Sequence, residues 1–101
     1  MELTHQQIEQ FDRDGFLVFP DLFDRNEVAV LHREVARLSG IDSEEVVREH
    51  TGGVRTIFRV HEDDGATRSK PFHALVRTPR LLRPVQQVLK DDGVYVYHTK
   101  I

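Results

Sequence analysis

Cysteine is absent from the 101-residue chain. Its absence excludes disulfides, a thiolate nucleophile and zinc held by sulfur, and it suits a reducing cytoplasm. Any bound metal would have to be held by histidine and carboxylate groups. The segment from Met1 to His5 carries neither the basic stretch nor the apolar run of a signal peptide or a membrane span. We therefore expect a cytoplasmic protein that has no membrane partner.

An excess of charge of one sign is also missing. Seventeen acidic and fourteen basic residues give a formal net charge of -3, and the arginines are scattered along the chain. The basic patch of a nucleic-acid binder is therefore absent, and a small molecule is the favoured partner. A composition of 39% hydrophobic and 31% charged residues is typical of a globular protein, and the length suits a single domain.

Common catalytic signatures are lacking as well. Ser39, Ser43 and Ser69 do not lie in the Gly-x-Ser-x-Gly elbow of a hydrolase. The six glycines form neither a phosphate-binding loop nor a dinucleotide-binding fingerprint. These absences argue against hydrolase and nucleotide-binding functions.

Two capping patterns predict helices in the first 40 residues. Thr4 followed by Gln7 is the pattern of a capping box and predicts a helix over residues 5–13. Asp24 begins a second such pattern, and apolar residues at helical spacing continue from it until Gly40. Further along, Pro71–Val76 predicts a short helix, and the Thr78-Pro79 pair is a typical start for another.

Four stretches predict strands. The apolar run 16–19, between a glycine and a proline, predicts a buried core strand. Residues 46–49 and 54–61 flank Thr51-Gly52-Gly53 and predict a β-hairpin. The final run, 94–101, is rich in β-forming residues. The polar segment 62–70 is expected to be a surface loop.

One short pattern is compatible with a metal site. His61 and Asp63 form a His-x-Asp pair that, with a distant histidine such as His98, matches the facial triad of non-heme iron. The pattern is short, and Asp63 is followed by an Asp-Gly turn. The alternative interpretation is a strand end that runs into an acidic loop.

Arg55, Arg59 and His61 alternate along the second hairpin strand. Cations on one face of a strand favour an anionic partner, and a planar carboxylate suits the fork of an arginine. The alternatives are that this face is exposed or that the protein's own carboxylates neutralise it. On the final strand, His98 and Lys100 share a face with valines, where a histidine is more often a core residue than a ligand.

The amino-acid sequences of several segments, and the order in which they occur, resemble the phytanoyl-CoA dioxygenase family. They are most similar to its ectoine and proline hydroxylase branch. The segments that carry the resemblance are Gln7–Val18, Arg55–His61, Thr78–Leu82 and Val94–Ile101. The resemblance implies an α+β chain that supplies the N-terminal helices and first strands of a double-stranded β-helix, or cupin-like jelly roll. Residues 1–101 would be the N-terminal portion of one dioxygenase domain, incomplete in this chain.

The resemblance also implies cofactors and site residues. Iron(II), 2-oxoglutarate as cosubstrate and molecular oxygen are expected in the parent enzyme, and the iron ligands are expected beyond Ile101. The His61-x-Asp63 pair would then bind no metal. Arg59, Thr99 and Lys100 are implied near 2-oxoglutarate, and Arg55, His61 and His98 near the substrate. Ectoine hydroxylases carry glutamine where His98 stands, so the substrate is left open between a small amino-acid-like molecule and an acyl-CoA. The alternative function is a small non-catalytic α+β binding domain.

Overall fold

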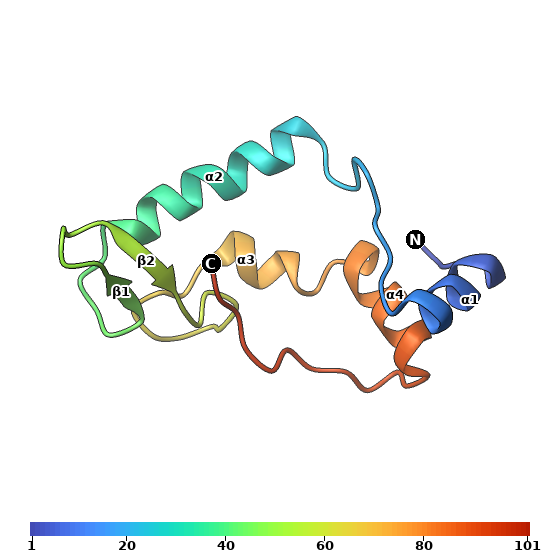
Figure 1. The fold of residues 1–101 in the computed structure, drawn as a ribbon. Coiled ribbons are helices and arrows are strands. Elements are labelled where there is room, and N and C mark those ends of the chain that lie inside the picture. The colour runs from blue at the N-terminus through green and yellow to red at the C-terminus, as the bar shows by residue number, and fades with distance from the viewer.

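The computed structural model describes every residue from Met1 to Ile101 and contains four helices and a two-stranded antiparallel sheet. The elements are α1 (His5–Asp14), α2 (Arg25–Ser39), β1 (Val46–Arg48), β2 (Val54–Ile57), α3 (Lys70–Leu75) and α4 (Pro79–Leu89). The molecule measures 47 × 28 × 25 Å, with the hairpin at one end and α1 and α4 at the other (Figure 1). None of the helices has the length and apolar character needed to cross a membrane.

The predicted capping boxes of α1 and α2 are confirmed, whereas Thr78 precedes α4 without a side-chain hydrogen bond to it. The Gln7 amide donates to the Thr4 hydroxyl over 3.2 Å, and the Glu27 amide donates to the Asp24 carboxylate over 2.8 Å, so each capping box satisfies two free amides. Gly15 ends α1 with a φ of 81°, a left-handed conformation that suits glycine. α3 begins at Lys70, one residue before the expected Pro71, because Ser69 caps it.

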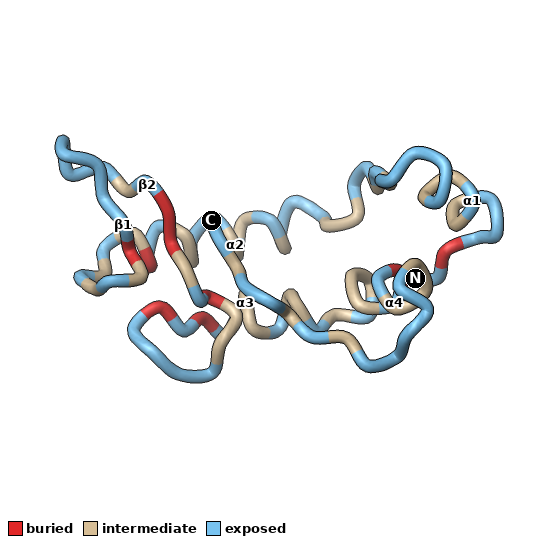
Figure 2. The backbone as a smooth tube through the Cα atoms, turned by 60° about the horizontal axis from the view of Figure 1, so that its bottom comes forward, coloured by how far each residue is buried: buried red, intermediate tan, exposed pale blue.

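The main core lies where the C-terminal end of α2 meets the hairpin. It consists of four buried hydrophobic residues, Leu38, Val46, Ile57 and Val60. Figure 2 shows the buried segments concentrated around β1, β2 and the loop that follows them. Nine of the 101 residues are buried, and the radius of gyration is 15.9 Å. A compact domain of this length has a radius of gyration of about 13 Å, so much of this chain lies at the surface.

A second contact region joins the chain's first residues to α4. The side-chain amide of Gln87 accepts from the Leu3 amide over 2.6 Å and donates to the Leu3 carbonyl over 3.2 Å, while Leu3 itself is buried. Arg80 of α4 then reaches the start of α2, where it pairs with Glu27 and stacks over the Phe23 ring. These contacts fix α1 and α4 at the end of the molecule opposite the hairpin.

The predicted core strand 16–19 is not formed. The segment belongs to no sheet, and Phe16 and Val18 are 60% and 72% exposed. A strand requires a neighbouring backbone segment that forms hydrogen bonds with its amides and carbonyls. No segment of residues 1–101 pairs with this one.

The three remaining predicted strands are shorter than expected or not formed, and β1 ends at Arg48, one residue before the predicted end. β2 ends at Ile57 rather than His61, because Arg59 adopts a left-handed φ of 63° and turns the chain. Residues 94–99 are extended but unpaired, and only Lys100 forms a bridge, to Phe58. Thr56 and Ile57, which lie on opposite faces of β2, are both buried, so β2 is covered on both sides at this point. The predicted surface loop is confirmed as irregular over residues 62–69, although Thr67 and Ser69 within it are buried and Lys70 belongs to α3.

Candidate functional site

Four of the six residues predicted to bind ligands lie together just beyond the end of β2. We call the group the β2-end cluster; it consists of Phe58, His61, His98, Thr99 and Lys100. Phe58 and Lys100 face each other in an antiparallel bridge, and the Lys100 ammonium lies 5.9 Å from the centre of the Phe58 ring. The His98 ring lies 6.5 Å from the Phe58 ring at an angle of 54°. The cluster therefore gathers two cationic or titratable groups around one aromatic ring.

Backbone pairing brings the two halves of the cluster together. The Ile57 amide donates to the Ile101 carbonyl over 2.9 Å, and the Ile101 amide donates back over 3.0 Å. Beside this pair, the Thr56 hydroxyl donates to the Ile101 carbonyl over 3.0 Å. His61 Nδ1 lies 2.8 Å from the Thr99 hydroxyl oxygen, so a side-chain hydrogen bond adds to the backbone bonds. These bonds fix the last residues of the chain against the end of β2.

Arg59 lies next to the cluster but already has anionic partners. Its Nε donates to the Glu62 carboxylate over 3.0 Å, and its Nη1 lies 3.6 Å from a Glu45 oxygen. The hydrogen bond from Arg59 lowers the pKa of Glu62 below its ordinary value, and the same bond raises the pKa of Arg59. The protein's own carboxylates therefore neutralise this arginine, as the alternative interpretation of the sequence allows.

Arg55 lies apart from the cluster. It is exposed, and its nearest carboxylate is Glu49 at 3.9 Å. Because β2 ends at Ile57, Arg55 does not continue into a single cationic face with Arg59 and His61.

The possible iron triad is not assembled. Asp63 pairs with His73 over 2.8 Å, His61 contacts Thr99, and His98 lies against aromatic rings. No group of three or more histidine or carboxylate side chains in the chain is arranged to hold a metal ion. The residues of this chain therefore do not fit an iron site.

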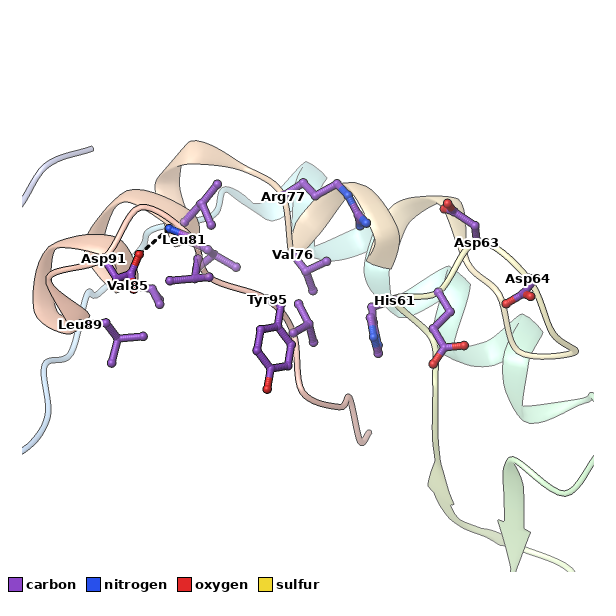
Figure 3. A pocket seen from close by; sticks show the side chains of 15 residues that line it. His61, Asp63, Asp64, Val76, Arg77, Leu81, Val85, Leu89, Asp91 and Tyr95 are labelled. Atoms are coloured by element: carbon purple, nitrogen blue, oxygen red, sulfur yellow. Dashed lines mark hydrogen bonds between the residues drawn. The ribbon is translucent and has the colours of Figure 1, made fainter.

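A groove of about 1060 Å³ runs from His61 along α4 (Figure 3). Its floor is apolar and comes from α4 and the extended segment, through Leu81, Leu82, Val85, Leu89, Val94 and Val96. Three carboxylate residues stand at the His61 end, namely Glu62, Asp63 and Asp64. The groove thus joins a hydrophobic surface to an acidic mouth.

Sequence reasoning missed three residues that shape this region. Phe58 supplies the ring around which the cluster gathers, and its position within an apolar strand gave no sign of that role. Thr67 is buried and donates to the Phe58 carbonyl over 2.6 Å, and His73 contacts the backbone of His61 over 2.8 Å. Both contacts bridge a loop, and no local pattern in the sequence reveals them.

Ectoine dioxygenases resemble this chain over nearly its whole length. Identity is 37% over 99% of the chain with the ectoine dioxygenase of Nocardia farcinica, and 36% over 97% of the chain with that of Bordetella bronchiseptica. The chain spans about a third of the length of these relatives, 33% and 32% respectively. No protein-family model matches the chain.

The fold is also similar to that of a solved structure. The crystal structure of EctD from S. alaskensis with 2-oxoglutarate and 5-hydroxyectoine superimposes with a TM-score of 0.81 over 97% of this chain, at 28% sequence identity. The match covers 34% of the EctD chain. Sequence and fold thus point to the same group of proteins.

Proposed function

We propose that residues 1–101 form one portion of an iron(II)- and 2-oxoglutarate-dependent dioxygenase that hydroxylates a small amino-acid-like substrate. The observation that carries the proposal is the similarity to ectoine dioxygenases, which spans 99% of the chain in sequence and 97% in fold. We assign the chain to the N-terminal portion of a phytanoyl-CoA-dioxygenase-like jelly roll. The rest of the domain would cover the apolar surface that this portion exposes.

The metal belongs, in this proposal, to the part of the protein outside these residues. Because no histidine and carboxylate group of the chain fits a metal ion, we assign the iron ligands to residues that follow Ile101. Iron and 2-oxoglutarate together would supply the oxidising chemistry. The share of this chain is to bind and orient the cosubstrate and the substrate.

Lys100 is the best placed of the three proposed cosubstrate residues. Its ammonium pairs with no carboxylate of the chain, so it is available to a carboxylate of 2-oxoglutarate. Thr99 stands next to it with a hydroxyl held by His61. Arg59 would join them only if the incoming carboxylate displaced Glu62, because that pair is already formed.

The proposed substrate residue His61 borders an acidic mouth, whereas His98 lies against the Phe58 and Tyr97 rings and does not line the groove. Glu62, Asp63 and Asp64 surround the His61 end of the groove. Glu62 is paired with Arg59 and Asp63 with His73, so Asp64 is the carboxylate of this end without an ion pair in the chain. Its negative charge would repel the phosphates of an acyl-CoA and would attract the cationic group of an amino-acid-like molecule. This charge favours the small substrate over the acyl-CoA. Arg55 is exposed and makes no contact with the β2-end cluster. It would take part only by binding a carboxylate of a bound substrate.

The alternative of a self-contained binding domain draws less support from the packing. A core of four buried hydrophobic residues is small for a chain of this length, and Tyr95 and Tyr97 are 86% and 85% exposed. Exposed aromatic groups on an unpaired extended segment favour a chain that packs against further protein.

Succinate formation tests the proposed function. The full-length protein that contains this chain would be incubated with iron(II), 2-oxoglutarate and oxygen, with ectoine, with a branched acyl-CoA, or with neither. We expect succinate to rise several-fold with the small substrate, together with a product heavier by one oxygen atom. Succinate at the uncoupled level with every addition, in protein shown to be folded, would refute the proposal.

A further inference from the structure

His73, which no sequence motif singled out, lies at the junction between α3 and the turn after β2. Its Nδ1 is 2.8 Å from the His61 carbonyl oxygen and 2.8 Å from an Asp63 carboxylate oxygen. Two of the three polar atoms around Nδ1 are acceptors and the third is the Arg77 Nη1 donor, so we assign the ring proton to Nδ1, from which a single N–H is shared between the two oxygens. The ring is thus a donor that bridges two points of one turn.

Through this donor, α3 fixes the orientation of His61. The carbonyl of His61 is held by His73, and the side chain of His61 is held by Thr99 over 2.8 Å. A residue tied at both its backbone and its ring has little freedom to rotate. The result is a continuous connection from α3 through His61 to the extended C-terminal segment.

Arg77 supports the same connection from one turn further along. Its Nη1 donates to the His73 carbonyl over 3.1 Å and lies 3.0 Å from His73 Nδ1. Since Nδ1 is itself a donor toward the two oxygens, the Arg77 bond that counts is the one to the carbonyl. Arg77 therefore holds the C-terminal end of α3 in place through its bond to the His73 carbonyl.

We propose that His73 is a positioning residue for the ligand-binding end of β2: by binding the His61 carbonyl and Asp63, it holds His61 and Thr99 in the geometry that receives 2-oxoglutarate. The inference rests on the proposed function for its catalytic consequence. Its structural part, the Nδ1 donor and the fixed His61 ring, stands on the contacts alone.

Replacing His73 by asparagine and by glutamine distinguishes a role of the Nδ1 hydrogen-bond donor from a role of side-chain size alone. The amide nitrogen of asparagine occupies nearly the place of His Nδ1, whereas that of glutamine lies nearer the place of Nε2. His73→Asn therefore retains the donor toward His61 and Asp63, and His73→Gln misplaces it. His73→Ala removes it, and His32→Ala, at an exposed position on α2, serves as the matched control.

The first test uses the full-length protein labelled with nitrogen-15 at histidine. We expect the His73 ring to show a protonated Nδ1, and we expect the His61 ring signals to shift in His73→Ala and His73→Gln but not in His73→Asn or His32→Ala. An unprotonated Nδ1 at neutral pH, or His61 signals unmoved by His73→Ala, overturns the inference whether or not the protein is a dioxygenase.

The second test measures turnover of 2-oxoglutarate by the same variants. We expect His73→Ala and His73→Gln to raise KM for 2-oxoglutarate about 5- to 10-fold with kcat nearly unchanged, the size expected from one lost hydrogen bond. His73→Asn should recover most of the wild-type KM. An unchanged KM in His73→Gln, or equal losses in the Asn and Gln variants, refutes the positioning role. If the wild type itself does not turn over 2-oxoglutarate, the proposed function fails and the nitrogen-15 result alone decides.

Discussion

Replacing Leu38 by alanine probes the small core at its centre. Leu38 is fully buried and packs with Val46, Ile57 and Val60 where α2 meets the hairpin. The change removes three carbon atoms, which is about 2.4 kcal/mol of lost transfer free energy at roughly 0.8 kcal/mol each. The cavity left behind adds to this, so we expect a loss of about 3 kcal/mol in the free energy of unfolding.

Urea unfolding followed by circular dichroism measures this loss. At an m value of about 1–3 kcal/mol/M, the midpoint should fall by roughly 1–3 M. Leu89→Ala is the matched control, because Leu89 is 61% exposed at the end of α4, and its effect should stay within about 0.5 kcal/mol. Equal midpoints for the two variants, or a loss below about 1 kcal/mol for Leu38→Ala, would refute the assignment of the core.

Three further predictions concern single contacts. The hydrogen bond from Arg80 lowers the pKa of Glu27 from 4.5 to about 2, so the pair stabilises the fold above pH 4.5 and this contribution is lost as the pH falls toward 2. Glu27→Gln should therefore flatten the loss of thermal stability between those pH values. Thr67→Val keeps the shape of the side chain but leaves the Phe58 carbonyl without its donor, which should cost about 1–3 kcal/mol in urea unfolding. Glu62→Gln releases Arg59 from its strongest partner and should lower KM for 2-oxoglutarate, whereas Arg59→Ala should raise it.

Each of these predictions has an outcome that contradicts it. An identical acid profile for Glu27→Gln and the wild type would mean that the pair with Arg80 does not form in solution. A Thr67→Val variant as stable as the wild type would mean that water donates a hydrogen bond to the Phe58 carbonyl in place of Thr67. If Glu62→Gln and Arg59→Ala both leave KM for 2-oxoglutarate unchanged, Arg59 has no part in binding the cosubstrate.

The helices were predictable because their start signals are local. Thr4 and Asp24 cap helices through side chains three residues away, and Gly15 ends α1 through its own backbone conformation. Such signals need no knowledge of the rest of the fold. The starts of α1, α2 and α4 accordingly match the sequence prediction within about one residue.

The strands were less predictable because they depend on distant partners. The runs 16–19 and 94–99 have strand-like composition, yet neither pairs with another segment of residues 1–101. The end of β2 depends on Arg59, whose left-handed backbone is unusual for a residue other than glycine. Composition reveals that a segment can extend, but it does not reveal which backbone lies beside it.

The residues of the candidate site came from the family resemblance rather than from residue types alone, and their roles stay a prediction. His61, His98, Thr99 and Lys100 were selected through the family resemblance, and the structure places them together. The partners that orient or neutralise these groups, His73 for His61 and Glu62 for Arg59, depend on how the loop after β2 folds back. That folding is set by long-range contacts such as the Thr67 bond to Phe58, which no spacing in the sequence reveals.

An anaerobic titration with iron(II) and then 2-oxoglutarate, followed by the visible charge-transfer band, tests the central claim most directly. It would be run on residues 1–101 and on the full-length protein that contains them. The account predicts a stoichiometric band for the full-length protein and none for residues 1–101, because the chain's own side chains do not fit a metal ion. A stoichiometric band from residues 1–101 that disappears in Asp63→Asn would contradict the account and would place the iron site within this chain.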